Sequence, residues 1–153
     1  MKNKNLITIS YDDFLLVLVK GGEKFIFPVS CAKNGRGEKE NSYKTPRGMF
    51  EIYKKIGKNA EIGSVFESRK KTGGVYKNGL VCKENAILSR ILWLNGLETH
   101  NKNTKNRYVY IHGTDRENAV GKVHFSHGCI VMKNADVLKL FDLVKAGDYV
   151  FIY

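Results

Sequence analysis

The chain has 153 residues, of which 42% are hydrophobic, and its 26 Lys and Arg against 15 Asp and Glu give a formal net charge of +11. Eight Phe, eight Tyr and the apolar run Phe14–Val19 need burial, so the composition excludes an intrinsically disordered chain. That run is the longest apolar stretch and falls far short of the roughly 20 residues that cross a bilayer. No export signal is visible, because Asp12 and Asp13 interrupt the apolar stretch that such a signal needs.

The first third of the chain predicts a β-meander, a polar loop and a further strand. Phe14–Val19 is apolar at every position, so we expect that strand to lie in a sheet covered on both faces. Lys20–Glu23 predicts a hairpin turn, and Pro46 with Gly48 predicts a turn before the next strand. The expected strands are 6–10, 14–19, 24–29 and 49–53, with a surface loop over 33–44.

The remainder of the chain predicts three strands and one helix. Residues 54–79 are rich in Gly, Lys and Arg with weak periodicity, which indicates a lid-like segment. Val137, Leu140 and Val144 recur at helical spacing and predict a helix over about 134–146. The expected strands are 86–94, 107–112 and 148–153, with a polar loop over 98–106. These elements predict a single, mainly β domain over 1–153, sandwich-like or barrel-like, with one main helix.

Cysteine usage and charge add few constraints. Three Cys, at positions 31, 82 and 129, are an odd number and do not support a disulfide framework. We expect Cys31 and Cys82 to be structural, and His100, in a polar loop, to be solvated. Lys and Arg are spread along the whole chain, so the charge indicates a basic surface suited to anionic surroundings, and we expect no nucleic-acid partner.

A cysteine and two histidines stand near one another after a predicted strand. Cys129 can act as an acyl-transfer nucleophile if a base accepts its proton and donors hold the oxyanion. His112, at the end of strand 107–112, can fold back as that base and would lower the thiol pKa toward neutrality. Gly128 lets the N–H groups around the cysteine converge, and His127 can orient or cap the thiol. The residues alone leave open that Cys129 is an inert core cysteine.

The motif Ser126–Ile130 (Ser-His-Gly-Cys-Ile), preceded by Ile111–Thr114 (Ile-His-Gly-Thr), closely resembles the signature of the L,D-transpeptidase catalytic domain, also called the YkuD domain. Other stretches resemble that family in the same order along the chain. They are Thr45–Phe50, Arg90–Glu98, Arg107–His112 and, after the cysteine, Asn134–Leu143. The resemblance covers most of the chain and implies the fold of that family.

The resemblance also implies an enzyme that acts on peptidoglycan stem tetrapeptides and needs no metal or organic cofactor. Cys129 would attack the carbonyl of the third residue and release the terminal D-Ala, with His112 as the base. The N–H groups of Gly128 and Cys129, with His127 nearby, would hold the oxyanion. An amine of a second stem would then accept the acyl group in a 3→3 cross-link. The residues expected to contact the substrate are Tyr110, Gly113, Thr114, Ser126 and Val131.

One position departs from the family pattern. Where the family usually carries Arg or Asn, this chain has Val131, and Lys133 is a candidate replacement anchor. A missing polar group costs about 1–3 kcal/mol of substrate interaction, which leaves an L,D-carboxypeptidase or related hydrolase as the alternative to a transpeptidase. In either case we expect carbapenems to label Cys129, a monomeric protein, and a periplasmic or exported location, since the substrate lies outside the cytoplasmic membrane.

Two other kinds of function remain open from the residues alone. His112, His124, His127 and Cys129 are nitrogen and sulfur ligands that suit zinc, although their spacing does not match the paired pattern of zinc fingers. A basic module could instead bind glycan or nucleic acid by stacking on aromatic side chains. The candidates for stacking are Tyr43, Tyr76, Trp93, Tyr108 and Tyr110.

Overall fold

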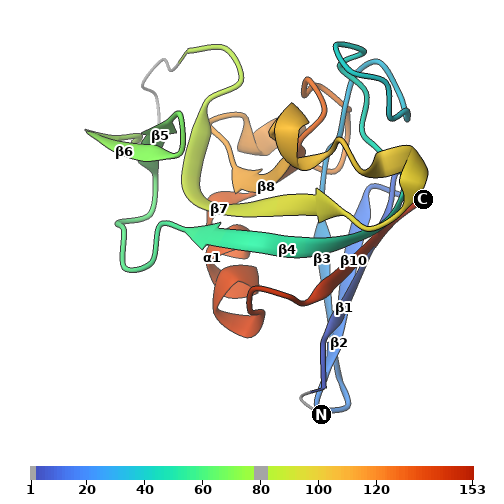
Figure 1. Cartoon of the computed structure of the whole chain (residues 1–153). Helices are drawn as coiled ribbons and strands as arrows, with labels where there is room; N and C mark the ends of the chain where they lie inside the picture. The colour runs from blue at the N-terminus through green and yellow to red at the C-terminus, as the bar shows by residue number, and fades with distance from the viewer. Residues whose placement is uncertain (1–2, 78–82) are drawn as a thin grey trace.

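The computed structural model describes residues 3–77 and 83–153, which form a ten-stranded mixed sheet and one α-helix (Figure 1). The strands are β1 (Leu6–Ser10), β2 (Leu15–Lys20), β3 (Glu23–Pro28), β4 (Gly48–Ile56), β5 (Ser64–Glu67), β6 (Lys70–Val75), β7 (Ile87–Gly96), β8 (Tyr110–Gly113), β9 (Ile130–Met132) and β10 (Tyr149–Ile152). The α-helix is α1 (Asn134–Leu143), and three short 3-10 helices are η1 (Thr99–Asn101), η2 (Lys105–Arg107) and η3 (Glu117–Ala119). The prediction of a mainly β fold with one main helix is confirmed. None of the described helices combines the length and the apolar character that a membrane span requires.

The first and last strands lie side by side within the sheet. The strand order is β3-β2-β1-β10-β4-β7-β5-β6, and β8 pairs with both β7 and β9 (Figure 1). β1 runs parallel to β10, with Ile7 beside Val150 and Ile9 beside Ile152. These four side chains are fully buried on one face, because residues two apart in a strand point to the same side. The pairing therefore joins the N-terminal meander to the rest of the domain.

Helix α1 packs on β7 and β8, and a lysine from β4 caps its C-terminus. The Nζ of Lys55 donates hydrogen bonds to the carbonyls of Phe141 (2.6 Å) and Val144 (2.8 Å). An ammonium group at this position satisfies carbonyls that have no partner inside the helix. The helix ends at Leu143, earlier than the predicted 146, because Val144 is extended and buried in the core.

β2 lies inside the sheet but is covered on one face only. Leu16 and Leu18 are fully buried, whereas Leu15 and Val19 are 37% and 56% exposed. The prediction that Phe14–Val19 is covered on both faces is therefore wrong. Side chains alternate across a strand, and the helix covers β7 and β8 rather than the outer face of β2.

The segment predicted to be lid-like, 54–79, contains the end of β4 and the hairpin of β5 and β6. β5 pairs with β7 through Val65 and Leu88, and Phe66 is buried against the sheet. Residues 78 and 79 lie outside the described part of the chain. The weak periodicity has a physical cause, since β6 is an edge strand whose residues are exposed on both faces except at its end.

The strand predicted over 107–112 begins only at Tyr110. Residues before it form η2, and Tyr108 adopts the left-handed conformation with a φ of 56°. The guanidinium of Arg107 donates a 2.7 Å hydrogen bond to the carbonyl of Lys44, which fixes the turn from a distant loop. The remaining predicted strands are present near their expected positions.

Candidate active site

Two parallel strands bring the predicted base and nucleophile to one place. β8 and β9 pair in parallel, with Ile111 beside Ile130 and His112 beside Val131. Cys129 immediately precedes β9, so it lies next to the strand that carries His112. Both residues line a cavity of about 440 Å³. Its other lining residues are Glu40, Asn41, Tyr43, Asn85, Ala86, Ile87, Asn106, Arg107, Tyr108, Val109, Thr114, Arg116, Phe125, Ser126, His127, Gly128 and Val131.

The thiol of Cys129 is half-buried, and it contacts two backbone groups of the segment that leads into β8. Its Sγ donates to the carbonyl of Tyr108 at 3.6 Å and accepts from the N–H of Tyr110 at 3.4 Å. Burial raises the pKa of the thiol to about 11, although the Tyr110 N–H and the charge of Arg107 act in the opposite direction. The prediction of a thiol pKa lowered toward neutrality is therefore wrong, because loss of solvation outweighs these contacts. Within the described residues, no hydrogen bond joins Sγ to His112.

The imidazole of His112 is buried, neutral and fixed in one tautomer. The residue is 4% exposed, and its Nδ1 lies 2.6 Å from the carbonyl oxygen of Gly113. Because a carbonyl only accepts, Nδ1 carries the proton and Nε2 presents a lone pair. Burial lowers the pKa of His112 to about 4, even though the bond to Gly113 favours the charged form. At neutral pH the site therefore holds a thiol and a neutral imidazole.

Gly113 orients the imidazole of His112 through its backbone carbonyl. A Cβ at this position would lie 2.7 Å from the carbonyl oxygen of Leu88 and would also clash with Asn134. Only glycine lets the strand approach this closely. The sequence predicts Gly113 as a substrate contact, whereas the structure gives its carbonyl the role of orienting His112.

The turn before Cys129 is closed by a serine. The hydroxyl of Ser126 donates to the carbonyl of Cys129 (2.6 Å) and accepts from the N–H of Gly128 (3.2 Å). Gly128 has a φ of 129°, which a residue with a side chain rarely adopts. Of the two N–H groups expected to hold the oxyanion, that of Gly128 is thus engaged by Ser126. Within the described chain, the N–H of Cys129 has no acceptor.

A threonine that is distant in the sequence anchors the same turn, and apart from the Thr-Pro pair no local pattern indicates this role. Thr45 is fully buried, and its hydroxyl donates to the carbonyl of Gly128 at 3.0 Å. The same hydroxyl accepts from the N–H of Ala32 at 2.9 Å. The turn that presents Cys129 therefore depends on the loop that leads into β4.

Comparison with known proteins gives the family of the chain. The sequence profile of YkuD, the L,D-transpeptidase catalytic domain, matches residues 4–152. The chain belongs to the L,D-transpeptidase catalytic domain family. Over 51 residues, which are 33% of the chain and 28% of the other protein, it is 47% identical to YqjB of Bacillus subtilis (strain 168), a protein assigned as an L,D-transpeptidase.

Solved L,D-transpeptidase structures share the fold. That from Xylanimonas cellulosilytica has a TM-score of 0.63 at 20% identity and covers 100% of this chain and 62% of its own. That from Mycobacterium smegmatis has a TM-score of 0.61 at 20% identity, with coverages of 98% and 58%. LdtMt1 in complex with imipenem has a TM-score of 0.59 at 21% identity, with coverages of 98% and 59%. The chain thus spans less than two thirds of the length of each of these relatives.

The predicted substrate contacts of this L,D-transpeptidase domain take different positions in the structure. Thr114 and Val131 are buried and line the cavity. Tyr110 does not line it, because its ring packs in a small core with Phe66 and Ile91. Its backbone N–H, rather than its side chain, reaches the thiol.

His127 lies at the open side of the cavity. Its side chain is exposed, and its Nδ1 is 3.2 Å from the Nδ2 of Asn85. Its ring lies 5.0 Å from that of Tyr43, measured between centroids. The residue therefore borders the cavity without a hydrogen bond to the thiol within the described chain.

Sequence reasoning missed two arginines that line the cavity. Arg107 is half-buried, and its guanidinium is used by carbonyls of the 37–44 loop. Arg116 is exposed and stacks over the ring of Phe125, with its Cζ 4.3 Å from the ring centroid. Within the described residues the Arg116 guanidinium donates no hydrogen bond, and the residue lines the cavity. No motif or spacing in the sequence distinguishes these two arginines from the other arginines of the chain.

The alternative zinc site is not formed, because His124 is used elsewhere. Its ring lies between those of Tyr11 and Phe14, at 3.8 and 3.9 Å between centroids. Its Nδ1 accepts from the N–H of Cys31, and its Nε2 lies 2.9 Å from the carbonyl of Tyr11. Both nitrogens are therefore occupied by structural hydrogen bonds. Across residues 3–77 and 83–153, no group of three His, Cys, Asp or Glu is placed to hold a metal.

The other residues with structural predictions have mixed outcomes. Cys31 is fully buried, as expected of a structural cysteine, and Cys82 lies outside the described residues. His100 was expected to be solvated, and it is half exposed but lies 3.1 Å from a carboxylate oxygen of Glu38. That contact helps to join the 33–44 loop to η1.

Proposed function

We propose that this domain is a peptidoglycan L,D-transpeptidase that forms a thioester between Cys129 and the third residue of a stem tetrapeptide. The observation that carries the proposal is that a half-buried thiol and a neutral imidazole line the same cavity, and that the Nε2 of this imidazole has no hydrogen-bond partner among the described residues. The family match and the imipenem complex of a structural relative support the same class of acyl chemistry. No step requires a metal or an organic cofactor.

The first half-reaction transfers the stem to the enzyme. Rotation about the Cα–Cβ bond of Cys129 moves Sγ from the Tyr108 carbonyl toward His112. The thiol proton passes to Nε2 as Sγ attacks the carbonyl carbon, and the free N–H of Cys129 donates to the oxyanion. His112 then gives its proton to the nitrogen of D-Ala, the C–N bond breaks, and a thioester and free D-Ala result.

The second half-reaction runs the same proton path in reverse. An amine of a second stem attacks the thioester, and His112 accepts a proton from that amine. The thiolate of Cys129 is released and accepts this proton from His112. With water as the acceptor the product is a tripeptide, which is the carboxypeptidase alternative. Because the resting thiol and imidazole are both neutral, proton transfer accompanies attack instead of preceding it.

Under this proposal, Arg116 binds the C-terminal carboxylate of the donor stem. Val131 supplies no polar group, and Lys133 is not among the residues that line the cavity. Arg116 is held over Phe125, and its guanidinium has no acceptor among residues 3–77 and 83–153, so its planar fork can take a carboxylate. The substrate implies that the protein acts outside the cytoplasmic membrane.

The proposal is tested by incubating the protein with a purified disaccharide-tetrapeptide. We expect mass spectrometry to show release of D-Ala with either a cross-linked dimer or a tripeptide, and to show a covalent adduct of imipenem on Cys129. Cys129→Ala should abolish both and leave the circular dichroism spectrum unchanged. Absence of turnover and of adduct in folded wild-type protein would overturn the proposal.

A further inference from the structure

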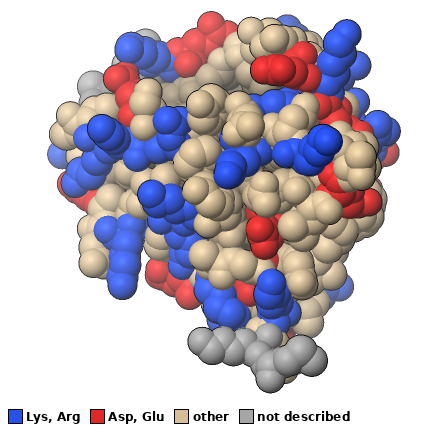
Figure 2. All heavy atoms as spheres, in the orientation of Figure 1, with Lys and Arg blue, Asp and Glu red and all other residues tan. Residues whose placement is uncertain are grey.

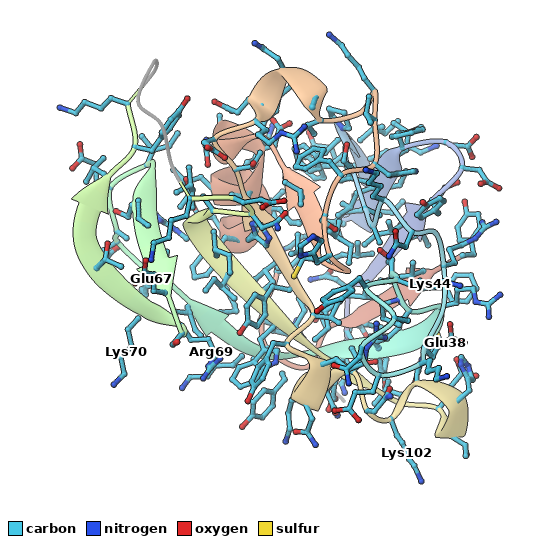
Figure 3. The ribbon with its side chains drawn as sticks, turned by 90° about the horizontal axis from the view of Figure 1, so that it is seen from above. Glu38, Lys44, Glu67, Arg69, Lys70 and Lys102 are labelled. Carbon is cyan, nitrogen blue, oxygen red and sulfur yellow. The ribbon has the colours of Figure 1, made fainter. Side chains whose placement is uncertain are left out.

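A second concave surface lies on the side of the domain built by β4, β5 and β6. It has a volume of about 500 Å³ and is lined by the end of β4, the turn between β5 and β6, and Trp93 of β7. Its lining residues are Lys54, Lys55, Ile56, Gly57, Lys58, Ser68, Arg69, Lys70 and Trp93, and we call this surface the basic groove. Lys and Arg side chains gather over this side of the molecule (Figure 2). Arg69 and Lys70 extend from the β5–β6 turn to the same side, away from Lys44 and Lys102 (Figure 3).

Four cations of the basic groove are not neutralised. Lys55 is committed to the C-terminus of α1 by its two hydrogen bonds there. Lys54, Lys58, Arg69 and Lys70 form no ion pair with any described carboxylate, and no acidic residue lines the groove. Like charges held together on a concave surface concentrate a positive potential that attracts anions.

The aromatic residues beside the groove already contact cations, namely Arg69 of the groove and the neighbouring Lys105. The guanidinium of Arg69 lies over the rings of Trp93 and Tyr108, at 5.1 and 4.7 Å from their centroids, and donates to the hydroxyl of Tyr110 at 3.1 Å. Lys105 covers Tyr53 in the same way at 4.6 Å. Each of these three rings, Tyr53, Trp93 and Tyr108, therefore already has a cation on one face, which disfavours stacking of nucleic-acid bases.

We propose that the basic groove binds a linear polymer of phosphate groups. Lysine ammonium groups bind phosphate as point charges, and the fixed fork of an arginine adds a directional contact. Four such groups along a groove suit a repeating anion better than a single small one. Arg69 also touches Tyr108, which lines the catalytic cavity and accepts the hydrogen bond of the Cys129 thiol. The polymer bound in the groove would therefore lie beside the catalytic cavity.

The test uses binding of fluorescently labelled inorganic polyphosphate, followed by anisotropy over a series of NaCl concentrations. Contact with four phosphates predicts that log K falls with log[salt] with a slope of roughly −3. The groove variant carries Lys54→Gln, Lys58→Gln and Lys70→Gln, and it should raise the Kd at least about tenfold and flatten the slope. None of these lysines belongs to the catalytic cavity, and their exposure leaves folding intact.

A control with the same change in net charge carries Lys24→Gln, Lys33→Gln and Lys102→Gln, which are exposed lysines outside the groove. It should raise the Kd less than about threefold. Equal losses of affinity in both variants would overturn the proposal in favour of a diffuse effect of the total charge. An unchanged Kd in the groove variant would show that the polymer does not bind in the groove. Tighter binding of poly-L-glutamate or of single-stranded oligothymidine than of polyphosphate, at equal numbers of charges, would overturn the assignment to phosphate polymers. The assay uses no stem peptide, so its result is independent of the proposed catalytic activity.

Discussion

The hydroxyl of Thr45 donates a 3.0 Å hydrogen bond to the carbonyl of Gly128, although the two residues lie far apart in the sequence. The same hydroxyl accepts the N–H of Ala32, so one buried oxygen joins three segments. This bond fixes the direction of the peptide that precedes Cys129. The geometry of the proposed nucleophile therefore depends on a residue that shares no hydrogen bond with its thiol in the described part of the chain.

Replacing Thr45 with Val should destabilise the protein and slow acylation of Cys129. The change keeps the shape of the side chain but leaves a buried N–H and a buried carbonyl without partners, which costs about 1–3 kcal/mol. Urea denaturation measures the loss, and the rate of adduct formation with imipenem measures the effect on the site. Thr45→Ser keeps the hydroxyl and should retain most of both properties. A Val variant as stable and as fast as wild type would contradict the role given to this bond.

The stability of the protein should fall in acid because of His112. Its pKa is about 4 when folded against an ordinary value of 6.5, so between these values the unfolded chain binds a proton that the folded one does not. The contribution is complete above pH 6.5 and is lost as the pH falls toward 4, by at most about 3 kcal/mol. His124, whose pKa burial also lowers, acts in the same direction.

His112→Gln should therefore reduce the slope of the unfolding free energy against pH between 6.5 and 4, without abolishing it. His127→Gln is the matched control, because it removes an exposed imidazole from the same domain. Chemical denaturation at several pH values provides the measurement. Identical slopes in wild type and His112→Gln would show that His112 is not neutral in the folded protein.

The thiol of Cys129 should alkylate slowly at neutral pH. Because burial raises its pKa to about 11, the thiolate fraction and the rate with iodoacetamide should rise about tenfold for each pH unit between 7 and 10. Peptide mapping by mass spectrometry follows the modification at each cysteine. Cys31 is fully buried and should stay unmodified in the folded protein. A rate that levels off near pH 7 would instead indicate a resting thiolate paired with a charged His112.

Arg116→Gln should weaken the binding of substrates that end in a free carboxylate. Loss of the guanidinium should raise KM for the tetrapeptide roughly tenfold, the effect of about 1.4 kcal/mol, with a smaller change in kcat. The same stem with a C-terminal carboxamide should have a similar KM with both proteins, and Arg116→Lys should recover part of the loss. Equal effects on the two substrates would rule out recognition of the carboxylate by Arg116.

The residue types of the candidate site are predictable from short stretches of sequence, because the proposed nucleophile, the proposed base and the glycine occur in compact motifs. The end of a predicted strand and a turn motif predict that His112 comes near Cys129, and in the structure β8 pairs with β9 and both residues line one cavity. The alternation of apolar residues likewise predicted most strands and the helix. Each of these features depends on neighbours within a few positions.

Other properties arise from contacts between distant segments. Whether Cys129 ionises depends on how much solvent the fold removes, which no local pattern reports. Three features depend on which group packs against a given residue. They are the tautomer of His112, the burial of only one face of β2, and the hydrogen bond from Thr45 to Gly128. Residue types and their spacing therefore decided which groups are present and which elements form, whereas packing decided their protonation and orientation, because solvation and long-range hydrogen bonds exist only once the chain is folded.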